Sequence, residues 1–116
     1  MIKVLCGGRF NFPHQGHEYF LREAKKHGDY LIVVIAHDVH NIKKSEIVDM
    51  EKRKQNLEKL KIADEVVIGD SQDFFKVVEK YQPQIIALGW DQKLPFPESK
   101  LEGFDIRVVK TDKLEK

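Results

Sequence analysis

Short apolar runs alternate along this chain with charged segments. The run at residues 30–36, Tyr-Leu-Ile-Val-Val-Ile-Ala, is continuous and rich in β-branched residues, which is typical of a central strand covered on both faces. Four shorter apolar runs predict further strands, at residues 2–6, 65–68, 85–88 and 106–109. The segments between them predict helices at residues 17–27, at residues 51–60 and after a cap at Asp70 or Ser71.

Each predicted helix carries apolar residues on one side. The third has an apolar stripe at positions i, i+3, i+4 and i+7, formed by Phe74, Val77, Val78 and Tyr81. Leu57 and Leu60 are the inward residues of the second helix, and Gly28 is placed to close the first helix as its C′ residue. These stripes indicate packing against a core.

The alternation of strand and helix predicts the fold class. Five short strands with interleaved helices indicate a parallel, doubly wound sheet in a Rossmann-like three-layer α/β/α sandwich. Residues 1–116 are expected to form one domain. Ligands of such sheets bind outside the carboxyl ends of the strands, where the polar segments 7–17, 37–49 and 89–92 converge.

Composition narrows the function classes. Lys and Arg total 20 and Asp and Glu 19, for a net charge of +1, so the chain has no general field to attract nucleic acid or an acidic membrane. No apolar run approaches the roughly 18 residues that span a bilayer, and no signal peptide precedes Gly7. The single cysteine, Cys6, is expected as a buried thiol, with a reactive nucleophile as the alternative. We expect a cytoplasmic protein.

The segment from Gly7 to His17 has the layout of a phosphate site. It follows a predicted strand, contains His14, Gly16 and His17, and leads into a helix whose first N–H groups have no intrahelical partner. Imidazoles can donate hydrogen bonds to phosphate oxygens as charge develops there. For the histidine pair alone, surface polar residues or a partial metal site are the alternatives.

These residues resemble the Gly-Thr-Phe-Asp and His-x-Gly-His signature of the small nucleotidyltransferases, which include the cytidylyltransferases and the archaeal-type FAD synthases. Arg9 stands where that superfamily usually has Thr, and Asn11 where it often has Asp. The resemblance implies that His14 and His17 are catalytic. It also implies nucleotide contacts from Gly7, Gly8, Arg9, Phe10, Asn11, His14, Gly16 and His17.

The segment at residues 37–49 supplies further candidates. Lys43 and Lys44 form a basic pair that by itself usually marks a solvated face. Similar enzymes carry phosphate-binding lysines here, and the resemblance implies that Lys44, the better match, is catalytic together with His14 and His17. Asp38 also matches an acidic residue of those enzymes. Arg53 resembles an arginine that helps to hold phosphates, although from the pattern alone it could be an exposed helix residue paired with a glutamate.

Residues 89–92, Gly-Trp-Asp-Gln, are the second region of resemblance. Gly89 permits close approach of a base or ribose, Trp90 offers a stacking surface, and Asp91 can accept hydrogen bonds. For Trp90, packing on the core edge is an equal alternative. The Asp91–Gln92 pair is most similar to the archaeal-type FAD synthases, and the resemblance implies that all four residues contact the nucleotide.

The resemblance implies transfer of a nucleotidyl group from a nucleoside triphosphate to a phosphate-bearing acceptor, with release of pyrophosphate. ATP with FMN is the preferred pair, and CTP with glycerol 3-phosphate is the alternative. Mg²⁺ is expected to enter with the triphosphate, without a metal site or a prosthetic group in the protein, and a homodimer is expected.

A nucleotide-binding or interaction protein that has lost turnover is the alternative from another class. Related enzymes continue past the last strand into a phosphate-binding segment, which residues 108–116 do not match. A missing tail, a different mode of holding the triphosphate and impaired activity are the three explanations open at this stage.

Overall fold

The computed structural model describes residues 1–8, 15–36, 50–70, 73–89, 92–94 and 96–111, with the backbone alone at residues 15–17 and 50. Five parallel strands form one sheet in the order β3-β2-β1-β4-β5. The strands are β1 (Lys3–Gly8), β2 (Tyr30–Ile35), β3 (Glu65–Ile68), β4 (Ile85–Leu88) and β5 (Arg107–Lys110). The helices are α1 (Gln15–Lys25), α2 (Met50–Leu60), α3 (Phe75–Tyr81) and the short 3₁₀ helix η2 (Glu98–Leu101).

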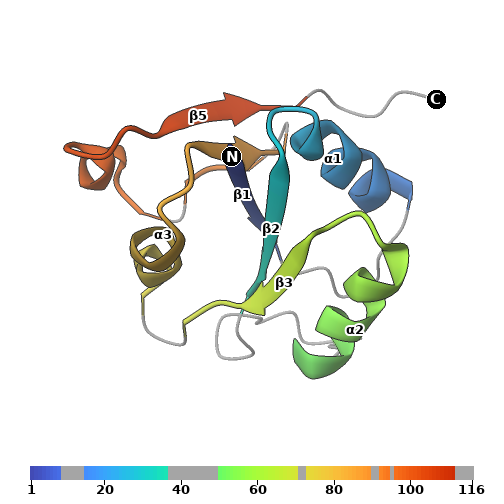
Figure 1. Ribbon diagram of the computed structural model, residues 1–116. Coiled ribbons are helices and arrows are strands. Elements are labelled where there is room, and N and C mark those ends of the chain that lie inside the picture. Colours follow the sequence, from blue (N-terminus) through green and yellow to red (C-terminus); the bar gives the residue numbers. More distant parts are fainter. Residues whose placement is uncertain (9–14, 37–49, 71–72, 90–91, 95, 112–116) are drawn as a thin grey trace.

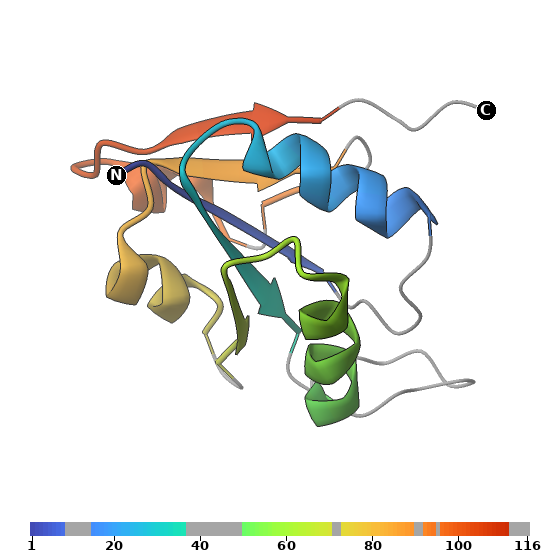
Figure 2. The same cartoon turned by 45° about the vertical axis from the view of Figure 1, so that its right-hand side comes forward.

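Helices cover both faces of this sheet, as the views in Figures 1 and 2 show, with α1 and α2 on one side and α3 on the other. The two hydrophobic cores follow from the alternation of side chains along the strands. In β1, Val4 and Cys6 pack with residues of α1 and α2, whereas Leu5 packs with residues of α3 and with Leu101 of η2. The three-layer sandwich predicted from the sequence is confirmed.

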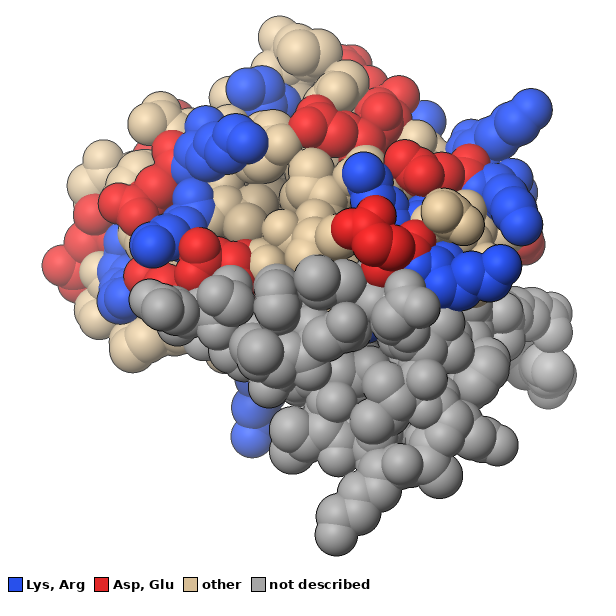
Figure 3. Space-filling view, turned by 90° about the horizontal axis from the view of Figure 1, so that it is seen from below, with Lys and Arg blue, Asp and Glu red and all other residues tan. Residues whose placement is uncertain are grey.

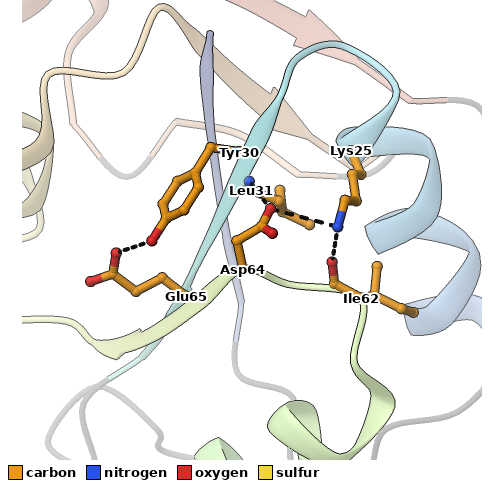
Figure 4. Close-up of polar contacts among 6 residues, drawn as sticks. All are labelled: Lys25, Tyr30, Leu31, Ile62, Asp64 and Glu65. Carbon is orange, nitrogen blue, oxygen red and sulfur yellow. Dashed lines mark hydrogen bonds and ion pairs between the residues drawn. The ribbon is translucent and has the colours of Figure 1, made fainter. Parts of the chain in front are cut away.

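The amino ends of β2 and β3 are held by polar contacts with neighbouring elements (Figure 4). Asp64 accepts a hydrogen bond from the backbone N–H of Leu31 at 2.8 Å, and its carboxylate lies 3.6 Å from the ammonium of Lys25. The same ammonium donates to the backbone oxygen of Ile62 at 2.8 Å, which ties the end of α1 to the segment before β3. This edge of the sheet is therefore fastened by side chains.

Gly28 differs from its predicted role. Helix α1 ends at Lys25, three residues earlier, and Gly28 does not have the positive φ of a left-handed C′ residue. A Cβ at this position would come within 2.7 Å of the backbone oxygen of Ile2 and 2.8 Å of a methyl carbon of Val4. The glycine is needed because the turn after α1 packs directly on β1.

The start of α3 also differs from the prediction. Asp70 is not the cap, because Phe74 is the N-cap residue, and Oδ1 of Asp73 accepts a hydrogen bond from the N–H of Phe75 at 2.9 Å. Ser71 lies outside the described residues. Phe75 rather than Phe74 is the buried aromatic residue of the helix. Its ring packs edge to face on that of Phe96, with 5.0 Å between the two ring centroids. The predicted stripe was therefore wrong at its first position.

Candidate active site

The candidate site lies at the carboxyl edge of the sheet. There β1 and β2 stay paired to their last residues, Gly8 opposite Ile35, and the N–H of Ala36 donates to the oxygen of Gly8 at 2.9 Å. The strand order turns back between β1 and β4, since β2 and β3 continue from β1 in one direction and β4 and β5 in the other. This is the switch point at which doubly wound sheets bind ligands.

Gly7 and Gly8 belong to β1 and not to the loop in which the sequence placed them, because β1 ends at Gly8 rather than at Cys6. A Cβ on Gly7 would lie 3.0 Å from the backbone oxygen of Val34 on the neighbouring strand. The described contacts therefore explain this glycine by the close approach of β2. They leave the prediction of a nucleotide contact at Gly7 and Gly8 untested.

Helix α1 begins at Gln15, two residues before the predicted start. Gly16 and His17 consequently lie in its first turn, where the unpaired N–H groups of a helix favour an anion. This is the strand-to-helix setting predicted for the histidine segment. The side chain of His17 lies outside the described residues, as do the candidates Arg9, Phe10, Asn11 and His14.

Arg53 is fully buried, with none of its surface exposed. It lies one turn before the buried residue Leu57, on the side of α2 that faces the sheet. The alternative of an exposed helix residue is therefore wrong. Its predicted contact with phosphate is untested, and Asp38, Lys43 and Lys44 lie outside the described residues.

Gln92 joins the two strands at the switch point. Its Oε1 accepts a hydrogen bond from the N–H of Gly89 at 2.7 Å, and its Nε2 donates to the backbone oxygen of Gly7 at 2.9 Å. Sequence reasoning proposed Gln92 as a nucleotide contact and gave no signal of this bridge, which connects residues 85 positions apart. Trp90 and Asp91 lie outside the described residues.

Cys6 is an inert part of the core. Its side chain is 1% exposed in β1, and burial raises the pKa of its thiol to about 12. The thiolate is the reactive form of cysteine. The buried thiol predicted from the sequence is confirmed, and the alternative of a nucleophile is wrong.

Within the described ranges, no group of three or more His, Cys, Asp or Glu side chains could hold a metal ion. No helix in that part of the chain is long and apolar enough to cross a membrane. Figure 3 views the molecule from below the orientation of Figure 1. Among the described residues of that face, acidic and basic side chains lie next to one another around an uncharged area.

Comparison with known proteins assigns the family. The cytidylyltransferase-like family profile matches residues 5–112. The chain belongs to the cytidylyltransferase-like family. The membership predicted from the two motifs is thus confirmed, and the match extends over all the strands and helices described above except the first residues of β1.

Two curated relatives of this cytidylyltransferase-like chain are named FAD synthase. The protein of Ferroglobus placidus is 46% identical over 93 residues, which cover 79% of this chain and 61% of the relative. The protein of Aciduliprofundum boonei is 40% identical over 121 aligned positions, covering 97% of this chain and 80% of the relative. The chain thus spans about three fifths of the first protein and four fifths of the second.

Two solved structures are similar to the chain. The crystal structure of the lipopolysaccharide core biosynthesis protein from Thermoplasma volcanium superimposes with a TM-score of 0.87 at 36% identity, covering 99% of both chains. The pantoate-beta-alanine ligase of Francisella tularensis, complexed with beta-gamma ATP and beta-alanine, superimposes with a TM-score of 0.69 at 12% identity. The superposition covers 99% of this chain and 60% of the ligase chain. The second likeness is one of fold alone.

Proposed function

We propose that this protein transfers the adenylyl group of ATP to FMN, forming FAD and releasing pyrophosphate. The observation that carries the proposal is the 40% identity to a FAD synthase over 97% of this chain. The fold supports it, because the histidine segment joins the carboxyl end of β1 to the start of α1 at the switch point. The name of the T. volcanium structure, by contrast, states a pathway and no reaction.

The proposed reaction is a direct displacement at phosphorus. A phosphate oxygen of FMN attacks the α-phosphorus of ATP, one P–O bond forms, and the bond to the leaving pyrophosphate breaks with the electron pair going to pyrophosphate. Positioning and stabilisation of charge then supply the catalysis, and no covalent enzyme intermediate is needed.

The predicted site residues take complementary roles in this proposal. His14 and His17 donate hydrogen bonds to the oxygens of the α-phosphate as their charge grows, and Lys44 neutralises the phosphates. The first turn of α1, with Gly16, presents backbone N–H groups to the same anion. Arg53 would hold the phosphates from α2.

The remaining nucleotide contacts in the proposal come from the ends of β1 and β4. They are Gly7, Gly8, Arg9, Phe10, Asn11, Gly89, Trp90 and Asp91. We propose that Mg²⁺ enters with ATP, whose phosphate charge it would neutralise. The imidazoles, the lysine, the arginine and the backbone amides of the proposed site can all donate hydrogen bonds to phosphate oxygens.

A homodimer, which rests on the family resemblance, and a cytoplasmic location, which rests on the composition of the chain, are part of the same proposal. Light scattering on a gel-filtration peak tests the assembly: a dimer mass is expected, and a monomer mass would remove that part of the proposal.

Pyrophosphate release tests the reaction. The protein is incubated with Mg²⁺ and each pair of ATP or CTP with FMN or glycerol 3-phosphate, and release is expected with ATP and FMN alone. His14→Ala should lower the rate by about 10²–10³, as for loss of one donor to a developing oxyanion. His27→Ala is the matched control, because His27 is exposed after the far end of α1.

Other outcomes overturn the proposal in defined ways. Release with CTP and glycerol 3-phosphate would make the protein a glycerol-3-phosphate cytidylyltransferase. Binding of ATP without release in any combination would favour a nucleotide-binding protein that has lost turnover. Equal rates for the His14→Ala and His27→Ala variants would remove His14 from the reaction.

A further inference from the structure

The carboxamide of Gln92 replaces strand pairing at the switch point. The paired residues of β1 and β4 are Val4 with Ile85 and Leu5 with Ile86. Beyond them, the structure gives no further register between these two strands among the described residues, whereas β1 and β2 remain paired to Gly8. The two strands thus part at the place where the strand order turns back.

Gln92 spans this gap with both ends of its side chain. The oxygen accepts from the N–H of Gly89, just past β4, and the nitrogen donates to the carbonyl of Gly7 in β1. The backbone N–H of Gln92 also donates to the oxygen of Gly89 at 3.1 Å, which closes the turn. Gln92 thereby satisfies the carbonyl of Gly7 and the N–H of Gly89, which would be paired in a continuous strand ladder.

Gly89 fits the same arrangement. It is buried, and a Cβ there would lie 3.4 Å from Oε1 of Gln92 and 3.5 Å from its Cδ and Cγ. A Cβ at this position would therefore be in van der Waals contact with the side chain of Gln92. The glycine permits the carboxamide to lie against the backbone of the turn.

We propose that Gln92 is a positioning residue, whose carboxamide fixes the loop after β4 relative to the end of β1. The inference rests on the proposed function: the β4 loop carries Trp90 and Asp91, and β1 leads to His14 and His17. Gln92 then acts through the spacing of these two segments rather than through contact with the reacting atoms. One hydrogen bond across the strands decides whether nucleotide and acceptor meet at the correct separation.

Gln92→Glu tests the bridge at nearly constant size. A glutamate keeps an oxygen to accept from Gly89, but when ionised it places a second acceptor against the carbonyl of Gly7. When protonated it regains a donor, and the facing carbonyl of Gly7, which disfavours the ionised form, raises the pKa of the new carboxyl above the ordinary glutamate value of 4.5. We expect kcat/KM relative to the unaltered protein to be about tenfold lower at pH 8 and to recover as the pH falls to 5.

Gln84→Glu is the matched control. Oε1 of Gln84 accepts from the N–H of Lys3 at 2.7 Å, so this glutamine joins the same two strands at their amino ends. A carboxylate preserves that bond, and the relative kcat/KM should stay near one from pH 5 to 8. Because each rate is divided by that of the unaltered protein, titrations that are the same in all three proteins cancel.

A measurement without substrate separates positioning from direct contact. In the free Gln92→Glu protein, the backbone ¹⁵N resonances of Gly8 and Gly89 should shift as the new carboxyl group titrates, and in the Gln84→Glu protein they should not. A flat rate ratio for Gln92→Glu, or the absence of these shifts, would overturn the positioning role.

The failure of the proposed function has a different signature. If the unaltered protein binds ATP but releases no pyrophosphate, the proposed function fails. The dissociation constant of ATP for each variant is then divided by that for the unaltered protein, in place of kcat/KM. A pH-dependent loss of ATP affinity in Gln92→Glu alone would then support the positioning role, and equal affinities would refute it. Absence of ATP binding in the unaltered protein would overturn both.

Discussion

Replacing Glu65 by glutamine is expected to destabilise the fold in a pH-dependent manner. The Glu65 carboxylate, at the start of β3, accepts a hydrogen bond from Tyr81 at the end of α3 at 2.6 Å. It also accepts one from Tyr30 at the start of β2 at 2.9 Å (Figure 4). One side chain therefore joins two strands and a helix, and a carboxamide offers a single uncharged acceptor oxygen in its place.

The magnitude follows from the shorter bond. A hydrogen bond to a charged group contributes about 1.5–3 kcal/mol when it is buried, and solvent reduces that contribution because Glu65 and Tyr81 are only partly buried. We therefore expect a loss of about 1 kcal/mol in the free energy of unfolding at pH 7. For a domain of 116 residues that loss lowers Tm by about 4 °C.

The pH dependence has two limits. The hydrogen bond from Tyr81 holds the pKa of Glu65 below its ordinary value of 4.5, so this contribution is present above that value and is lost as the pH falls. The hydrogen bond to Glu65 raises the pKa of Tyr81 from 10.0 to about 12, so this contribution is present below pH 10 and is lost as the pH rises toward 12.

Urea unfolding at pH 3.5, 7 and 11 measures both limits. The difference between the unaltered protein and Glu65→Gln should be greatest at pH 7 and smaller at the other two values. Glu79→Gln, at an exposed position of α3, is the control and should change stability little. A difference at pH 7 no larger than that of the control, or one that is constant with pH, would refute this reasoning.

Two glycine substitutions and one labelling experiment give further predictions. Gly28→Ala should cost about 1–3 kcal/mol, because its Cβ would lie 2.7 Å from the oxygen of Ile2 and 2.8 Å from a methyl carbon of Val4. Gly103→Ala should cost about 1 kcal/mol through its φ of 88° alone, since among the described residues no atom beyond its two chain neighbours lies within 4 Å of the added carbon. Urea unfolding measures both, and a smaller cost at Gly28 than at Gly103 would contradict the steric argument. Cys6, with its pKa of about 12, should resist Ellman's reagent at pH 8 until denaturant is added; rapid labelling of the native protein would contradict its burial.

The fold was predictable where local sequence and burial agree. β3 and β4 begin and end where the apolar runs at residues 65–68 and 85–88 do, and β2 differs from its run by one residue. β1 was predicted too short because Gly7 and Gly8 have low strand propensity, and only pairing with Val34 and Ile35 extends it. β5 is shifted by one residue because its register is set by Ile85 opposite Arg107.

The candidate site was predictable at the level of its segments. The glycine and histidine motifs placed it at the carboxyl edge of the sheet, and the family match confirmed that the chain belongs to the family that these motifs indicated. The complete burial of Arg53 was not predictable, because an arginine in a charged helix is usually exposed. The bridge from Gln92 to Gly7 was not predictable either, since it depends on how β1 and β4 diverge in three dimensions.

Transfer of a radioactive label from ATP tests the central claim most directly. The protein is incubated with FMN, Mg²⁺ and ATP labelled at either the α- or the γ-phosphate, and the flavin products are separated. Adenylyl transfer predicts that the α-label appears in FAD and the γ-label in pyrophosphate. Recovery of the α-label in ADP or AMP, with no labelled flavin, would contradict the assignment of this protein as a FAD-forming adenylyltransferase.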